Sequence, residues 1–137
     1  MSWDVLYLNY HGDPPKDLRS DDDGLDVLGS AEDVHAAIAR TLPDVNWSDP
    51  VWGMYMGNGF TLEFNTGNGD PVQAIMVHVR GGGDPIPTLL QVAAPNKWSL
   101  YDCSMGEFID PEHPSGEGWE GFQAFRDKIV GKTRGPD

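Results

Sequence analysis

The fold depends on residues 51–65, which have the sequence VWGMYMGNGFTLEFN. In the middle of this stretch, Asn58-Gly59 is the dipeptide that supplies the positive φ angles of a type I′ hairpin turn. Apolar and polar residues alternate along 60–65. A strand with that period buries one face and exposes the other. The stretch therefore predicts a β-hairpin with strands at 51–56 and 60–65.

The register of this hairpin decides which face carries Trp52, Met54 and Met56. A two-residue turn pairs Tyr55 with Leu62 and places the three residues on the face opposite Leu62, as an aromatic–methionine patch that favours partner binding. A three-residue turn shifts the pairing by one residue and buries the three in the core. The chain has five tryptophans that need apolar surroundings, so we expect the buried arrangement.

Hydrophobic periodicity predicts further strands and helices on both sides of the hairpin. Ser30 is a favourable helix N-cap and Pro43 stops a helix, so we expect a helix at 31–42. The other elements are, in chain order, a strand at 3–9, a strand at 72–80, a helix at 85–94, a strand at 98–103 and a helix at 119–130. The order β-α-β-β-β-α-β-α predicts an α+β fold, with helices packed on one face of a four- to five-stranded, mainly antiparallel sheet.

Length and composition predict a single domain over 1–137, with an acidic loop at 11–29 and a disordered C-terminal tail at 131–137. The chain of 15.0 kDa has 9 basic and 22 acidic residues, a net charge of −13. Such a surface repels phosphate backbones and anionic lipid, so we expect no nucleic-acid and no membrane binding. One cysteine excludes an internal disulfide, and no signal peptide is evident. These features predict a cytoplasmic protein.

The acidic loop is densest at Asp21, Asp22, Asp23 and Asp26. A calcium loop of the EF-hand type needs glycine at its sixth position and glutamate at its twelfth. Gly24 as the sixth residue puts serine at the twelfth, so the calcium interpretation fails and we expect no metal site. The loop is either a solvated segment or a surface that attracts a basic partner.

No set of residues in the sequence has the spacing of a catalytic or cofactor site. Cys103, His78 and Asp102 form the only thiol–imidazole–carboxylate set, but adjacent residues of a strand point to opposite faces. The glycines at 81–83 lack the lysine of a phosphate-binding loop. We therefore expect no catalytic residue and no cofactor. The alternative is a small enzyme or ligand-binding protein with a pocket between sheet and helices, formed by Glu63, His78, Arg80 and Asp102.

Short motifs across residues 28–110 carry a resemblance to a protein group. They are Leu28-Gly29-Ser30, Trp52-Gly53, Glu63-Phe64-Asn65 with Gly67, His78-Val79-Arg80-Gly81 with Asp84, and Asp102-Cys103-Ser104-Met105-Gly106-Glu107-Phe108. With these motifs the chain resembles small acidic bacterial proteins, some of which are similar to immunity proteins encoded beside polymorphic or contact-dependent toxins. The resemblance implies an inhibitor that binds a basic protein, and it supplies no catalytic residue.

Three hypotheses follow. The first is a non-enzymatic interaction protein of the immunity or antitoxin type. Its partner-binding residues would be Asp21, Asp22, Asp23 and Asp26 in the loop, with Trp52, Met54 and Met56 on the sheet. The second is the enzyme or ligand-binding alternative. The third is a homodimer formed through an exposed sheet face.

Overall fold

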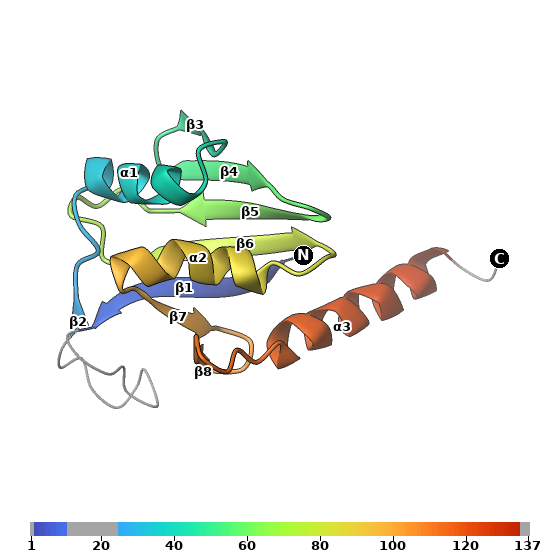
Figure 1. The fold of residues 1–137 in the computed structure, drawn as a ribbon. Coiled ribbons are helices and arrows are strands. Elements are labelled where there is room, and N and C mark those ends of the chain that lie inside the picture. Colours follow the sequence, from blue (N-terminus) through green and yellow to red (C-terminus); the bar gives the residue numbers. More distant parts are fainter. Residues whose placement is uncertain (1, 11–24, 135–137) are drawn as a thin grey trace.

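The computed structural model describes residues 2–10 and 25–134, and their side chains except at 126 and 129–134. Within these residues the chain is an α+β fold with one large antiparallel sheet and three helices (Figure 1). Much of the acidic loop, including Asp21, Asp22 and Asp23, lies outside the described residues, as do residues 135–137.

The strands and helices of the described residues have the following bounds. The strands are β1 (Trp3–Tyr10), β2 (Leu25–Asp26), β3 (Asn46–Asp49), β4 (Trp52–Met56), β5 (Phe60–Asn65), β6 (Ile75–Gly81), β7 (Ser99–Asp102) and β8 (Glu107–Ile109). The helices are α1 (Ala31–Thr41), α2 (Ile86–Asn96) and α3 (Glu117–Arg134). The strand order is β3-β4-β5-β6-β1-β7-β8, and β2 pairs with β1.

Among the described residues the sheet already has eight strands, so the prediction of four to five was wrong. The missed strands β2, β3 and β8 have two, four and three residues. Segments this short give no run of alternating residues long enough to indicate a strand. They form because β1, β4 and β7 offer backbone partners along their length.

The hairpin of β4 and β5 has the register that we did not expect. Tyr55 pairs with Leu62, so Trp52, Met54 and Met56 lie on the face opposite Leu62 and the predicted burial of the three was wrong. The need of tryptophan for apolar surroundings is met elsewhere, because Trp3, Trp98 and Trp119 are buried.

The turn of this hairpin has Asn58 and Gly59 at its centre, closed by a 2.8 Å hydrogen bond from the Gly57 N–H to the Phe60 carbonyl. Gly59 has a φ of 89°, but Lys97 is the only non-glycine residue with a positive φ in the described part of the chain. Asn58 therefore has a negative φ. The type I′ turn requires positive φ at both central residues, so that prediction was wrong.

Helices α1 and α2 cover the face of the sheet that carries Leu62 (Figure 1). Ser30 caps α1 as predicted, with its Oγ accepting from the Asp33 N–H at 3.1 Å. The Tyr7 hydroxyl donates to the Leu89 carbonyl of α2 at 2.7 Å, which joins that helix to the centre of the sheet. This layer of apolar side chains is the core of the domain.

Helix α3 meets this face only near its N-terminal end. It packs through Trp119, whose ring centroid is 5.5 Å from that of Trp3, and then extends away from the sheet (Figure 1). Phe125, farther along this helix, is 55% exposed. The helix runs to Arg134, beyond its predicted end at residue 130. The prediction that the helices pack on one face therefore fails for α3.

Within the described residues, no helix is both long and apolar enough to cross a membrane. Over the same ranges, 2–10 and 25–134, no three His, Cys, Asp or Glu side chains gather as a metal site requires.

Candidate functional site

The sheet face opposite α1 and α2, called the open face below, carries most of the residues that the sequence singled out. Met54 pairs with Glu63, Glu63 with His78, and His78 with Asp4, so a row of side chains runs across four strands. Successive residues of a strand alternate between faces. The open face therefore includes Asp4, Leu6, Trp52, Met54, Met56, Glu63, Met76, His78 and Arg80.

Large apolar side chains on strand β4 are exposed on the open face. Met56 is 81% exposed and Met54 is 37% exposed. Trp52 is half-buried, and its ring stacks on His78 with centroids 5.6 Å apart and planes 25° apart. Methionine side chains are flexible and polarizable, and they adapt to the shape of a partner. The β4 side of the open face is thus an apolar surface, in which the stacked ring of Trp52 lies beside the two flexible methionine side chains.

The polar side chains of the open face are paired with each other. Arg80 forms an ion pair with Glu63, and His78 Nδ1 lies 2.7 Å from Asp4 Oδ1. The Ser2 hydroxyl donates to the same Asp4 oxygen at 2.5 Å. A serine nucleophile would have to face the histidine nitrogen that the carboxylate leaves free. Ser2 instead lies 3.4 Å from Nδ1, the nitrogen that contacts Asp4, so this cluster has no triad geometry.

Asp102 lies on the other face of the sheet, apart from Glu63, His78 and Arg80. It pairs with Val5 and is 3% exposed. Its Oδ1 accepts from Trp3 Nε1 at 3.1 Å, from the Ser104 N–H at 2.9 Å and from the Ser104 hydroxyl at 2.7 Å. The carboxylate therefore holds the turn after β7. The structure brings together three of the four residues proposed for a pocket, and it places those three away from α1 and α2.

Cys103 is exposed on the turn that follows β7. Partial burial of the thiol, and then the negative charges of Asp4 and Asp102, raise its pKa to about 11. The thiol is therefore protonated at neutral pH, whereas a nucleophilic cysteine needs a thiolate.

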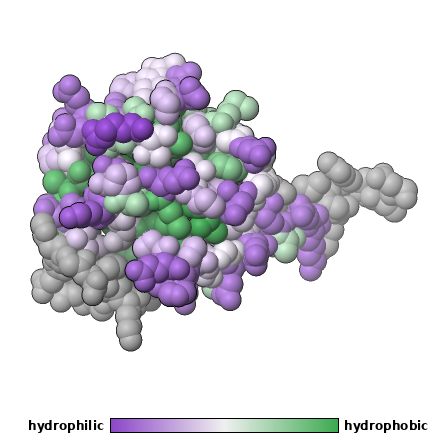
Figure 2. Space-filling view, in the orientation of Figure 1, coloured by the Kyte–Doolittle hydropathy of each residue, from purple (hydrophilic) through white to green (hydrophobic). Residues whose placement is uncertain are grey.

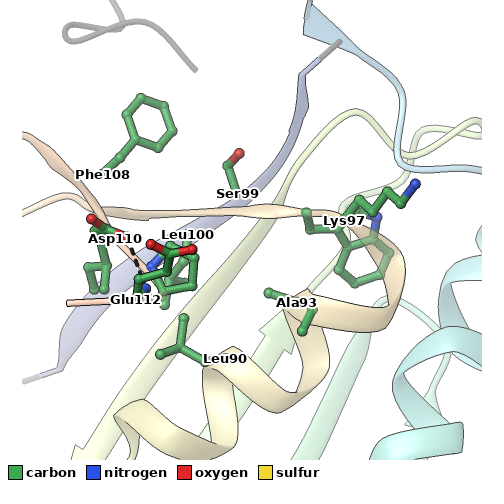
Figure 3. Close-up of a pocket in the computed structure, with 12 residues that line it drawn as sticks. Leu90, Ala93, Lys97, Ser99, Leu100, Phe108, Asp110 and Glu112 are labelled. Carbon is green, nitrogen blue, oxygen red and sulfur yellow. Dashed lines mark hydrogen bonds between the residues drawn. The ribbon is translucent and has the colours of Figure 1, made fainter. Parts of the chain in front are cut away.

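A cleft at the opposite edge of the sheet was missed by the sequence analysis. It lies between α2 and the β7–β8 hairpin and has a volume of about 670 Å³ (Figure 3). Its wall includes Leu90 and Ala93 of α2 and Leu100, Phe108 and Ile109 of the hairpin. In Figure 2, hydrophobic residues show at the centre of the helix-covered side, bordered by hydrophilic ones. The adjacent apolar residues Phe108 and Ile109 were the available signal, but two residues are too few to predict a strand.

The loop residue Asp26 is not close to the methionines in the strand order. It lies in β2, exposed, and its Oδ1 accepts from the Val27 N–H at 2.7 Å. Strand β2 pairs with β1, and β6 and β5 stand between β1 and β4. The part of the proposed acidic contact surface that the structure describes is therefore separate from Trp52, Met54 and Met56.

Comparisons with protein-family models, with curated proteins and with solved structures gave no match. The resemblance to immunity-type proteins thus stays a hypothesis. Function has to be inferred from the open face and the cleft themselves.

Proposed function

We propose that this chain is a non-enzymatic protein-interaction domain that binds a basic protein through its open face. The observation that supports this most is the exposure of Met54 and Met56 beside Trp52, on the side that α1 and α2 leave uncovered. Apolar side chains gathered on a surface favour association with a partner. The fold does not depend on these two methionines, because the hydrophobic core lies on the other face of the sheet.

The charge of the chain indicates the kind of partner. A net charge of −13 attracts a basic protein over long range and increases its association rate. On the open face itself, Arg80 offsets Glu63 and His78 contacts Asp4. The long-range attraction of a basic partner therefore comes from the net charge of the whole chain, while the apolar contact forms at Trp52 and the two methionines. A basic toxin, inhibited in the cytoplasm by this chain, fits both features.

The enzyme alternative has less support from the described side chains. Glu63, His78 and Arg80 lie on the open face, so no pocket between sheet and helices contains them. Asp102 is engaged by four hydrogen bonds to its Oδ1. Homodimerisation through the open face is the remaining alternative, since the same apolar side chains would serve it.

A capture experiment separates binding of a basic partner from homodimerisation. The tagged full-length chain is incubated with an extract of its native host, alongside the double variant Met54→Glu, Met56→Glu. Both methionines are exposed, so the variant keeps the fold. We expect the native chain to retain a basic protein that elutes at raised salt, and the variant to lose it. Retention of the same protein by both chains would contradict the open-face contact. If the native chain, measured without extract, has twice the mass of a monomer and the variant does not, the result would favour the homodimer.

A further inference from the structure

We propose that the cleft between α2 and the β7–β8 hairpin binds a small hydrophobic amine: a compact apolar body that carries one cationic group. This inference is independent of the open face, because the two sites lie at different edges of the sheet. It concerns a free small molecule.

The shape of the cleft follows from how two elements end. Helix α2 ends at Asn96, and its C-cap residue, Lys97, has a left-handed φ of 57° at the point where the chain turns back into β7. Strand β8 ends at Ile109, opposite Leu100, so the first residue of β7 has no partner in β8. The cleft left between them has a volume of about 670 Å³, which is within the range of binding sites for small organic ligands.

The inner surface of the cleft is apolar. Leu90 and Ala93 come from one turn of α2, and Leu100 and Ile109 come from a directly paired position of β7 and β8. Trp98 also lines the cleft, 8% exposed, with its ring centroid 5.6 Å from that of Tyr7. An apolar ligand body would displace water from this surface with a favourable free energy.

Two carboxylates lie together at one end of the cleft (Figure 3). The Glu112 N–H donates to Asp110 Oδ1 at 2.9 Å, which fixes one carboxylate beside the backbone of the other. His113 lies 3.7 Å from Asp110 but is 85% exposed, so this pair contributes little. Among the described residues no cation pairs with Glu112.

The remaining charged residue of the wall, Lys97, lies at the other end of the cleft, with its amine away from the two carboxylates (Figure 3). The acidic end therefore has a local excess of negative charge that its own wall does not neutralise. An ammonium group placed there would gain charge-assisted hydrogen bonds, while a carboxylate would be repelled. Apolar floor and acidic end together select an amine over a neutral or anionic molecule of the same shape.

Three probes with one skeleton test this proposal: 4-phenylbutylamine, 4-phenylbutanol and 4-phenylbutanoate. Each is titrated into the full-length protein at neutral pH, with binding followed by calorimetry and by the tryptophan fluorescence to which Trp98 contributes. We expect the amine to bind about threefold more tightly than the alcohol, because the Asp110 side chain is 60% exposed and solvent screens part of its attraction to the ammonium group. The butanoate should bind most weakly of the three.

The variant Asp110→Asn, Glu112→Gln separates the charge from the apolar surface. It should bring the affinity of the amine down to that of the alcohol and leave the alcohol unchanged. A matched control, Glu32→Gln with Asp44→Asn, removes the same charge at exposed positions outside the cleft and should preserve the preference. Equal binding of all three probes, no binding of any, or an amine preference that survives in the cleft variant would each overturn the proposal.

Discussion

Phe64 and Met56 belong to the same hairpin, but they have different surroundings. Phe64 is fully buried under the helices, whereas Met56 is 81% exposed on the open face. The register places alternate residues of β4 and β5 on opposite sides of the sheet, so the same hairpin supplies residues to the core and to the open face. Apolar residues on the covered face hold the domain together. Met54 and Met56 on the open face are exposed and can contact another molecule.

The largest effect should come from the covered face. Phe64→Ala removes a ring from the core and should lower the free energy of unfolding by about 3–5 kcal/mol. Met56→Ala, in the neighbouring strand, should change it by less than about 0.5 kcal/mol because its side chain is exposed. Urea unfolding of both variants measures this difference. A similar loss in both would mean that the open face is also part of the stabilising core.

A second effect concerns the packing of α3 against the sheet. A Cβ added to Gly118 would lie 1.8 Å from Asp102 Oδ2, so Gly118→Ala displaces a buried carboxylate and should cost about 1–3 kcal/mol. Gly121→Ala meets nothing within 4 Å and should be neutral or stabilising, since alanine favours helix. Thermal unfolding distinguishes the two. Equal stability of both variants would show that α3 does not pack on Asp102.

The ion pair of the open face should contribute less. Arg80 and Glu63 have 41% and 16% of their side chains exposed, so solvent screens part of their attraction. A double-mutant cycle with Arg80→Met and Glu63→Gln should give a coupling of less than about 1 kcal/mol. A coupling of several kcal/mol would indicate that the open face stabilises the fold through its polar side chains.

Cys103 should have the smallest effect on stability. Its pKa of about 11 lies above the ordinary value of 9.0, so the folded state favours the protonated thiol and this contribution is lost only as pH rises through that range. Cys103→Ser should therefore leave stability at neutral pH unchanged. The alkylation rate of the folded protein should rise with a midpoint near pH 11, and a midpoint well below 9 would contradict the assigned environment.

Local patterns predicted the elements whose signals are contained in a few residues. The Ser30 cap and the hairpin at Asn58-Gly59 are of this kind. The register was not predictable in this way, because it depends on which tryptophans fill the core, and Trp3 and Trp119 come from opposite ends of the chain. The hydrogen bond from Trp3 to Asp102 joins residues 99 positions apart. No local pattern therefore indicated that Asp102 lies on the other face from Glu63, His78 and Arg80.

The cleft needed the same kind of long-range information. It lies where α2, β7 and β8 meet. The three residues of β8 form a strand because they pair with β7, and their own sequence does not indicate one. By contrast, the grouping of Glu63, His78 and Arg80 was present in the pattern of two strands once these were paired. Sequence spacing thus indicated neighbours on one sheet face, and only the assembled domain showed which face it was.

Methyl NMR of ¹³C-methionine-labelled protein tests the open-face contact most directly. The chain has five methionines, and Met54 and Met56 report on the open face while Met105, 43% exposed, reports on the turn between β7 and β8. The captured basic protein is titrated into the labelled full-length chain. We predict that the signals of Met54 and Met56 shift or broaden while that of Met105 stays in place. A perturbation of Met105 with Met54 and Met56 unchanged would contradict the proposed function.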